Sequence, residues 1–374
     1  MLPSPAFIIE EEKLHENLEL LALIKKATDV KLLFALKGFA LPALMQDILQ
    51  VADGIAASSL NEARFGYIYS GKPVHVYAPA YRPGDIPHLI SLTSHWTFNS
   101  LEAFYRWESL LPMDMAIGLR INPHYGFASA DMYNPGRKGS RLGVPPSAAQ
   151  KPLPKRITGL HVHTLCEAGA EALEELIAHL QEGFSPWLSQ IRWLNLGGGH
   201  AFTRKGYDIN SFVRNIQLLR KSFPQVEEIY VEPSAAFVWE AGFLFTEILD
   251  ITQTEGRMWA LLDVSFSAHM PDTLEMPYKP LIREALPSPD PTYPTYWMGG
   301  ITCLAGDEMG PYSFSSPLSV GQHLTFHDMA HYTFVKTTLF NGVAHPSLII
   351  HRAGGYRIVK TFGYEDYVRR LSNG

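Results

Sequence analysis

Lys37 stands where a lysine side chain could do covalent chemistry. It directly follows an apolar run, residues 32–36. An ammonium group is poorly solvated at such a place, which lowers the pKa of the lysine and leaves an amine able to form a Schiff base with a carbonyl compound. The alternative is a lysine that extends from the end of a strand into solvent.

Three consecutive glycines form a second unusual feature. Gly197, Gly198 and Gly199 follow the apolar run 193–196. Their backbone N–H groups are not obstructed by Cβ atoms, and such a loop can cradle a phosphate. A tight turn that needs positive φ is the alternative.

Two histidines and a glutamate add further candidates. His161 and His163 alternate along a β-like stretch and should point to one face. A metal would need more ligands than the local spacing offers, so we expect none, but one ring could stack on an aromatic cofactor. Glu232 ends the run 229–231, where a buried carboxylate needs a partner such as a protonated pyridine nitrogen. Core histidines and a structural salt bridge are the respective alternatives.

The elements around these residues follow the pattern of βα units. Short apolar runs rich in β formers alternate with longer segments of helical period, such as 101–111, 168–181 and 209–223. The eight runs are residues 32–36, 54–57, 74–77, 96–98, 116–121, 158–162, 193–196 and 229–231. Eight strands predict a closed (β/α)₈ barrel, with an open doubly wound sheet as the alternative. Because the active site of such a barrel lies at the C-terminal ends of its strands, the candidate residues should converge.

After about residue 239 the sequence becomes β-rich and predicts a second domain. Its runs are residues 243–252, 259–266, 323–326, 347–351 and 356–362, and 287–294 reads as a loop. Residues 7–10 could pair into this sheet from the other end of the chain. We therefore expect a barrel domain at 30–240 and a β-rich domain made of 1–29 and 241–374.

Composition and charge favour a folded globular protein whose partner is a small molecule. The 374 residues carry a net charge of −6 with no block of like charge, so we expect no nucleic-acid or membrane partner. Residues 1–12 do not resemble a signal peptide, and no apolar run has the length of a membrane span. The two cysteines, Cys166 and Cys303, fit a reducing compartment, and we expect a cytoplasmic location.

The order and spacing of several segments resemble the fold-type III pyridoxal-phosphate decarboxylases, the family of ornithine and diaminopimelate decarboxylases. The segments are Phe34-Ala-Leu-Lys37, Ala57-Ser-Ser-Leu-Asn-Glu62, His161-Val-His-Thr-Leu-Cys-Glu167, Asn195-Leu-Gly-Gly-Gly-His200, Glu232-Pro233, Cys303-Leu-Ala-Gly-Asp307, Asp328-Met-Ala-His-Tyr332 and Phe340-Asn-Gly342. The resemblance spans nearly the whole chain and implies a barrel with a second β domain.

The resemblance also implies roles for particular residues. Lys37 would hold pyridoxal phosphate, His163 would stack on its ring and Glu232 would pair with its pyridine nitrogen. Gly197, Gly198, Gly199 and Tyr332 would hold the phosphate. The family commonly has Gly after Glu-Pro, whereas this chain has Ser234 and Ala235, and it lacks the phosphate-binding arginine that ornithine decarboxylases place there.

In the resembling family a homodimer completes the site, so Cys303 and Asp307 would act in the partner's barrel. Cys303 would donate the proton after CO₂ loss, since a thiol with a pKa of about 8.5 is mostly protonated at neutral pH. Candidates for contacts with the substrate are Glu167, Asp263, Asp272, Asp307 and Phe340.

The residue after Cys303 favours the carboxynorspermidine branch of the family. Leu304 stands where ornithine decarboxylases have an acidic residue. The expected substrates are carboxynorspermidine and carboxyspermidine. The alternatives are a decarboxylase of diaminopimelate or ornithine, a racemase on the same fold, and a non-catalytic protein that binds the cofactor.

Overall fold

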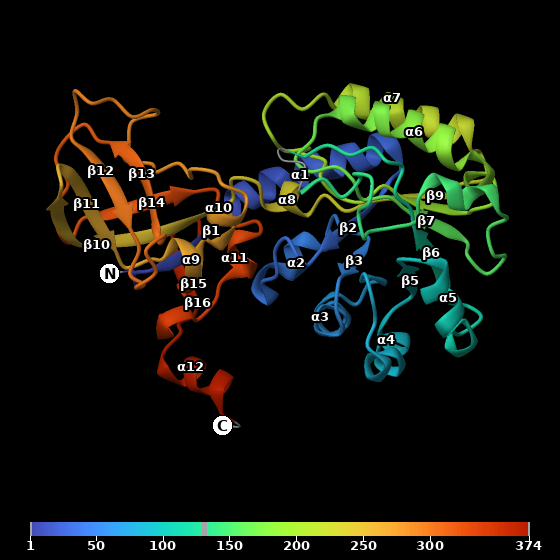
Figure 1. Ribbon diagram of the computed structural model, residues 1–374, viewed down its shortest axis with the longest axis horizontal. Coiled ribbons are helices and arrows are strands. Elements are labelled where there is room, and N and C mark those ends of the chain that lie inside the picture. Colours follow the sequence, from blue (N-terminus) through green and yellow to red (C-terminus); the bar gives the residue numbers. More distant parts are fainter. Residues whose placement is uncertain (1, 129–132, 373–374) are drawn as a thin grey trace. The chain divides into compact units, whose positions relative to one another are not determined.

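The computed structural model describes residues 2–128 and 133–372. The chain divides into two compact units, Asn17–Phe237 and Met1–Glu16 together with Val238–Gly374. Figure 1 follows the chain from its blue N-terminal end to its red C-terminal end. The first unit thus starts at Asn17, within a long helix, and the Asn17 side chain donates a hydrogen bond to the carbonyl of Phe237 at 3.3 Å.

The first unit is a closed barrel of eight parallel strands. The strands are β2 (Lys31–Ala35), β3 (Gly54–Ala57), β4 (Val74–Tyr77), β5 (His95–Phe98), β6 (Ala116–Arg120), β7 (Gly159–His161), β8 (Trp193–Asn195) and β9 (Glu228–Val231). The barrel closes where β2 pairs with β9, with Lys31 opposite Tyr230. Each of the eight runs expected from the sequence overlaps one of these strands. The barrel prediction is confirmed, and the open-sheet alternative is wrong.

Helices follow most of the barrel strands (Figure 1). They are α2 (Met45–Ile48), α3 (Leu60–Ser70), α4 (Ile86–Leu92), α5 (Leu101–Trp107), α6 (Ala170–Leu188), α7 (Ile209–Ser222) and α8 (Ser234–Val238), with short 3₁₀ helices at Pro42–Leu44, Pro83–Asp85, Glu108–Leu110 and Pro146–Gln150. Helix α1 (Glu11–Thr28) precedes the first barrel strand. Ser59 caps α3 by accepting the N–H of Glu62, and Asp208 caps α7. Between β6 and β7 the described residues contain no α-helix, so this βα unit departs from the expected alternation.

Aromatic rings fill the interior of the barrel below the strand ends. Trp193 packs with Tyr230, Leu33 and Ala35 in a buried cluster. A Cβ atom on Gly159 would lie only 1.9 Å from the Trp193 ring, so glycine makes room for the indole at that position. Because this part of the interior is packed, a reactive site can lie only at the C-terminal ends of the strands.

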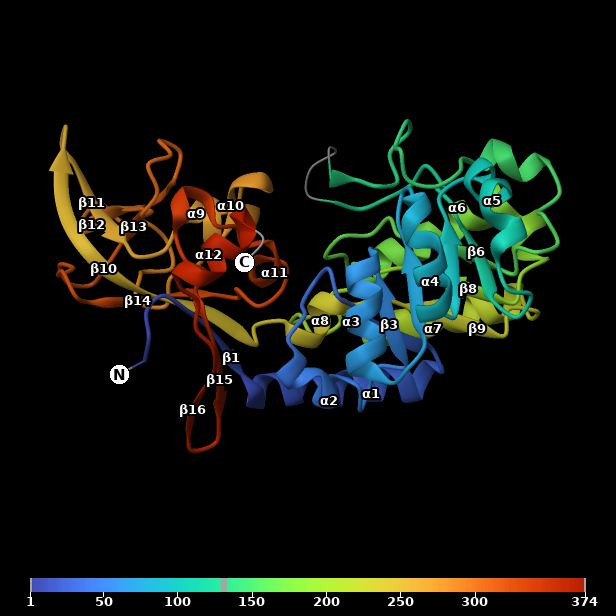
Figure 2. The ribbon, with the colours of Figure 1, turned by 90° about the horizontal axis from the view of Figure 1, so that it is seen from below.

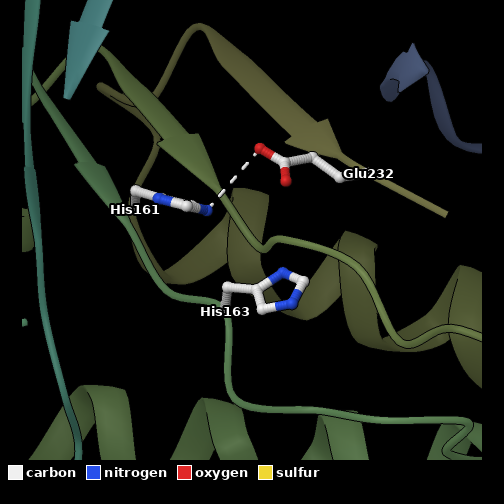
Figure 3. Close-up of side chains that lie close together, drawn as sticks. All are labelled: His161, His163 and Glu232. Carbon is white, nitrogen blue, oxygen red and sulfur yellow. Dashed lines mark ion pairs between the residues drawn. The ribbon is translucent and has the colours of Figure 1, made fainter. Parts of the chain in front are cut away.

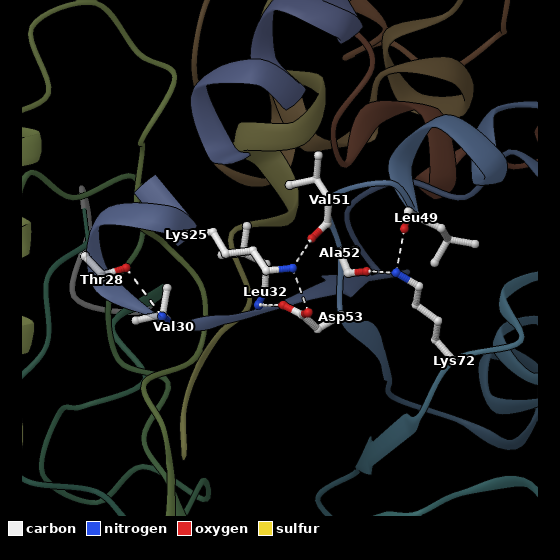
Figure 4. A network of polar contacts seen from close by, with 9 residues as sticks. All are labelled: Lys25, Thr28, Val30, Leu32, Leu49, Val51, Ala52, Asp53 and Lys72. Atoms are coloured by element: carbon white, nitrogen blue, oxygen red, sulfur yellow. Dashed lines mark hydrogen bonds and ion pairs between the residues drawn. The ribbon is translucent and has the colours of Figure 1, made fainter. Parts of the chain in front are cut away.

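A polar network ties the start of the barrel together (Figure 4). Asp53 accepts hydrogen bonds from Lys25 Nζ at 2.7 Å and from the N–H of Leu32 at 2.9 Å, which joins α1 to the first two barrel strands. Lys72 donates to carbonyl groups of the turn before Asp53. Because these groups lie at the N-terminal ends of the strands, their role is stability.

The second unit is built on an eight-stranded sheet with the order β13-β12-β11-β10-β1-β15-β16, and β14 pairs with β10. The strands are β1 (Ala6–Glu10), β10 (Gly242–Thr254), β11 (Arg257–Leu262), β12 (Thr295–Gly299), β13 (Glu308–Ser313), β14 (His323–His327), β15 (Ser347–Arg352) and β16 (Gly355–Lys360). Figure 2 shows β10 as a long curved strand and β15 with β16 as a hairpin. β1 pairs with both β10 and β15, which confirms that residues 7–10 join this sheet.

Short helices complete the sheet unit. They are α9 (Phe266–His269), α10 (Pro271–Glu275), α11 (Thr333–Lys336) and α12 (Tyr364–Leu371), with a 3₁₀ turn at Phe340–Gly342. β12 and β13 were not expected from the sequence, and the expected run 259–266 extends into the start of α9. Within the described part of the chain, no helix is both long and apolar enough to span a membrane.

Candidate active site

A pocket lies within the barrel unit. Its lining includes Lys37, Arg120, His161, His163, Asn195 and Glu232. These residues end or follow β2, β6, β7, β8 and β9. The structure therefore brings three of the expected site residues, Lys37, His163 and Glu232, into one pocket.

The Lys37 amine lies against a histidine in this pocket. Its Nζ atom is 3.4 Å from Nε2 of His163. Burial lowers the pKa of Lys37; the Glu232 carboxylate opposes this shift, and the Arg120 guanidinium adds to it. A lysine with a lowered pKa has a larger fraction of neutral, nucleophilic amine.

The glycine loop is held by side chains of the site. Asn195 Oδ1 accepts the N–H of Gly197 at 2.8 Å, and Nδ1 of His163 accepts the N–H of Gly198 at 2.6 Å. Gly197 has a φ of 70°, so the turn with positive φ is present. The sequence suggested that the N–H groups of Gly197, Gly198 and Gly199 hold a phosphate. Two of these are already engaged, and among the described hydrogen bonds only the N–H of Gly199 is free.

Glu232 is buried and has two neighbours in the pocket. Asn195 Nδ2 donates to its Oε1 at 2.8 Å, and Nε2 of His161 lies 3.6 Å from the same oxygen. Figure 3 shows the His161 ring and the Glu232 carboxylate pointing toward one another, with the His163 ring beside them. Burial, with the nearby Arg120 and Lys37 charges, lowers the pKa of His161 well below its usual value, so this ring is neutral.

Several pocket residues were not found by sequence reasoning. Arg120 is 4% exposed, donates to the carbonyl of His163 at 2.8 Å, and stacks 4.6 Å above the Tyr77 ring. Asn195 links the glycine loop to Glu232. Arg120 lies within the apolar run 116–121, and Asn195 opens the resembling segment Asn195-Leu-Gly-Gly-Gly-His200, but no role was expected for either residue.

The pocket fits an aromatic cofactor with a carbonyl group and a basic ring nitrogen. It offers an amine with a lowered pKa at Lys37, a flat ring at His163 and a carboxylate at Glu232. Neither ring nitrogen of the buried His161 has a hydrogen-bond partner among the residues that the structure describes, and the same holds for Arg120 Nε. Buried polar atoms without partners point to a polar ligand in the space beside them.

Two histidines and a glutamate of the pocket are also close enough together to share a metal ion. His161, His163 and Glu232 each offer one ligand atom within 4.8 Å of the others. Local spacing in the sequence does not reveal this arrangement, because Glu232 lies near the histidines through the side-by-side pairing of β7, β8 and β9.

The remaining candidates differ in how far their polar atoms are already satisfied. Asp307 is buried, and four hydrogen bonds hold its carboxylate. Oδ1 of Asp263 accepts the hydroxyl of Thr246 and the N–H of Glu247. Asp272 is 6% exposed, and its Oδ1 has no hydrogen-bond partner within residues 2–128 and 133–372.

Other expected site residues lie on irregular backbone or at the surface. Glu167 is exposed and has a φ of 47°, and Tyr332 has a φ of 57°. Cys303 and Phe340 are exposed on the sheet unit. Cys303, Asp307, Asp263, Asp272, Phe340 and Tyr332 all belong to the sheet unit, and the others belong to the barrel unit.

The barrel, the sheet domain and the lysine pocket define a pyridoxal-phosphate enzyme. The family model described as "Pyridoxal-dependent decarboxylase, C-terminal sheet domain" matches residues 44–330. The chain belongs to this family of decarboxylases and is a carboxy-lyase that uses pyridoxal phosphate. The family resemblance, the cofactor and the enzyme class expected from the sequence are confirmed.

Two curated relatives align with nearly the whole chain. A carboxyaminopropylagmatine decarboxylase of Synechocystis is 46% identical, over 99% of this chain and 96% of the relative. A carboxynorspermidine/carboxyspermidine decarboxylase of Campylobacter jejuni is 37% identical, over 99% of this chain and 98% of the relative. The crystal structure of carboxynorspermidine decarboxylase from Campylobacter jejuni in complex with norspermidine superimposes with a TM-score of 0.91 at 36% identity, covering 99% of this chain and 100% of that one.

Proposed function

We propose that this chain decarboxylates a carboxylated polyamine, carboxynorspermidine or carboxyspermidine. The observation that carries the proposal is the pocket in which the Lys37 amine lies 3.4 Å from His163, with Glu232 in the same lining. Full-length relatives with these substrates in their names, and a solved relative that holds norspermidine, support the choice of substrate.

Carboxyaminopropylagmatine is a second candidate substrate. The relative with this name shares 46% of its residues with the chain, against 37% and 32% for the carboxynorspermidine/carboxyspermidine relatives. The agmatine part ends in a guanidinium group, whereas norspermidine ends in a primary amine. Both are long cations that need carboxylates far from the reacting carbon.

The pocket residues hold the cofactor and set its charge. Lys37 would hold pyridoxal phosphate covalently through its amine, the ring of His163 would stack on it, and Glu232 would keep the pyridine nitrogen protonated. When bound, pyridoxal phosphate accepts the electron pair that remains when the α-carboxylate leaves as CO₂. Asn195 orients the Glu232 carboxylate through its 2.8 Å hydrogen bond.

The phosphate would be held by the Gly197–Gly199 loop and by Tyr332. The N–H of Gly199 is the one that remains free among the described hydrogen bonds of the loop. Tyr332 comes from the family resemblance alone, and Tyr332→Phe should weaken cofactor affinity if it contacts the phosphate.

Cys303 would return a proton to the substrate carbon in place of the lost carboxylate. It is exposed on a loop of the sheet unit, next to Leu304 and near Ile301 in sequence, which are 46% and 44% exposed. An exposed thiol among exposed apolar side chains fits a surface that docks against a second copy of the chain. We therefore propose a homodimer in which Cys303 acts at the partner's barrel, and we keep the cytoplasmic location expected from the sequence.

Asp272 would bind an amine of the substrate. Its buried Oδ1 lacks a partner within the described chain, while its Oδ2 accepts hydrogen bonds from Tyr278 at 2.6 Å and Thr333 at 2.8 Å. An oriented carboxylate with one free oxygen is suited to a cation. Glu167, Asp263 and Phe340 stay as weaker candidates.

A substrate panel tests the proposal. The purified protein with pyridoxal phosphate is incubated with carboxynorspermidine, carboxyspermidine, carboxyaminopropylagmatine, ornithine and diaminopimelate, and CO₂ and the product amine are measured. The proposal predicts the highest kcat/KM for one of the first two, and a higher value for carboxyaminopropylagmatine would select the second candidate. Equal or better turnover of ornithine or diaminopimelate would reject both.

A further inference from the structure

One buried carboxylate anchors the loop that carries Cys303. Asp307 is 4% exposed, and each of its oxygens accepts one backbone N–H and one hydroxyl. Oδ1 accepts the N–H of Ser267 at 3.0 Å and the hydroxyl of Ser265 at 3.1 Å. Oδ2 accepts the N–H of Thr302 at 3.1 Å and its hydroxyl at 2.5 Å.

These bonds join the cysteine loop to the start of helix α9. Main-chain hydrogen bonds close the loop as well, from Gly300 N to the carbonyl of Asp307 at 2.7 Å and from Asp307 N to the carbonyl of Leu304 at 2.9 Å. A Cβ atom on Gly300 would lie 2.2 Å from Oδ2 of Asp307. The loop is therefore shaped around this carboxylate.

A third segment holds the cysteine itself. The N–H of Cys303 donates to Oδ1 of Asn341 at 3.1 Å, and Asn341 has a φ of 55°. The Cys303 side chain nevertheless remains exposed. The backbone of Cys303 is thus fixed from two sides while its thiol stays accessible.

We propose that Asp307 is a positioning residue, which fixes the Cys303 loop through Thr302, Ser265 and Ser267 and does not contact the substrate. A carboxylate has about four lone-pair sites, and those of Asp307 are all engaged within its own unit. The inference rests on the proposed role of Cys303 as proton donor. Because a general acid acts only within hydrogen-bond reach of its target, a loop that drifts loses rate and not substrate affinity.

Three substitutions test this proposal by steady-state kinetics. The amide in Asp307→Asn has one acceptor oxygen, so either Thr302 or Ser267 keeps an N–H facing an NH₂ group. Thr302→Val removes one hydroxyl donor and keeps the shape, and Thr302→Ser keeps the donor. We expect kcat to fall about 100-fold in Asp307→Asn and about tenfold in Thr302→Val. Thr302→Ser should match the wild type, and KM should stay nearly constant in all three.

Hydrogen exchange gives a readout that does not depend on activity. Amides of residues 300–307 should exchange faster in Thr302→Val than in the wild type or Thr302→Ser. The matched control is Asp290→Asn, since Asp290 accepts two hydrogen bonds from Thr292 in another loop of the same unit. In this control both the exchange of residues 300–307 and kcat should be unchanged. If Asp307→Asn does not fold, Thr302→Val alone still tests the proposal.

A double-mutant cycle separates this inference from the role of Cys303. If Asp307 acts through the thiol, Asp307→Asn should add little to the loss caused by Cys303→Ser. Wild-type kcat in Cys303→Ser would refute the proposed proton donor. An impaired Cys303→Ser together with wild-type kcat in Thr302→Val and Asp307→Asn, or with fully multiplicative losses, would overturn the positioning role of Asp307.

Discussion

The backbone N–H of Gly198 donates to Nδ1 of His163 at 2.6 Å, and this bond determines where the imidazole carries its proton. Burial, with the Lys37 and Arg120 charges, lowers the pKa of His163 well below its usual value, so the ring is neutral and its proton lies on Nε2. Nε2 is 3.4 Å from Lys37 Nζ. An N–H at that position can be accepted only by an unprotonated amine, so the glycine loop favours the nucleophilic form of Lys37.

The first prediction concerns the pH dependence of cofactor capture. The rate at which cofactor-free protein gains the absorbance of bound pyridoxal phosphate should rise with pH and level off below pH 10.5, because the pKa of Lys37 is lowered. His163→Phe keeps a flat ring but removes the Nε2 donor, so its midpoint should lie at higher pH than that of the wild type. A midpoint that is unchanged in this variant would contradict the proposed effect of His163.

Buried histidines should make the protein less stable in mild acid. Burial lowers the pKa of His95, His200 and His269 to about 4 in the folded chain, against about 6.5 in an unfolded one. Above pH 6.5 these rings are neutral in both states, and their contribution is fully present. Between pH 6.5 and 4 the unfolded chain binds protons that the folded chain does not. The free energy of unfolding should therefore fall by about 1.4 kcal/mol for each ring and each pH unit.

His200 offers a direct check of this slope. The ring is 2% exposed and stacks on Phe202 at 5.3 Å, and its two nitrogens have no hydrogen-bond partner in the described chain. Urea unfolding of His200→Phe between pH 7 and 5 should show a shallower loss of the unfolding free energy than the wild type. Parallel slopes for the two proteins would mean that His200 does not titrate as its burial implies.

Asp272 should matter for long substrates and not for short ones. Losing a charged contact in a desolvated site costs about 2 to 5 kcal/mol, so Asp272→Ala should strongly lower kcat/KM for carboxynorspermidine. A truncated amino acid that cannot reach Asp272 should be affected much less. Glu167→Ala tests the exposed alternative in the same assay, and a loss confined to Glu167→Ala would move the amine site there.

The shared site of the proposed homodimer predicts complementation between inactive variants. Lys37→Ala lacks the amine in the barrel and Cys303→Ala lacks the thiol in the sheet unit, so a hybrid dimer would contain one intact site. Mixing the two proteins under conditions of subunit exchange should restore part of the activity. If mass spectrometry shows hybrid dimers and activity stays absent, the two residues do not act across the interface.

The barrel could be predicted because its strands are buried on both faces, so each one reads as a short apolar run such as residues 54–57 or 74–77. β13 was missed because Gly310 and Pro311 interrupt its pattern, and β12 was missed because it is short and directly follows the loop 287–294. β12 and β13 are strands because they pair with each other, and β12 also pairs with β11. Long-range pairing cannot be read from local periodicity.

The site was predicted only as far as strand ends reveal it. Lys37 and Glu232 stood out because a charge ends an apolar run. The link from Asn195 to Glu232 spans 37 residues, and the contact of Lys37 with His163 spans 126. The hydrogen bonds of Asp307 to Ser265 and Ser267 span about 40 residues, and they are the basis for proposing an internal anchor where the sequence suggested a substrate contact.

The most direct measurement is to identify the lysine that carries the cofactor. The yellow protein is treated with borohydride, which makes the bond between lysine and cofactor permanent, and its peptides are mapped by mass spectrometry. The account predicts that the label lies on Lys37, and that Lys37→Ala neither shows the absorbance of the bound cofactor nor takes up label. A label on any other lysine, with Lys37 unmodified, would contradict it.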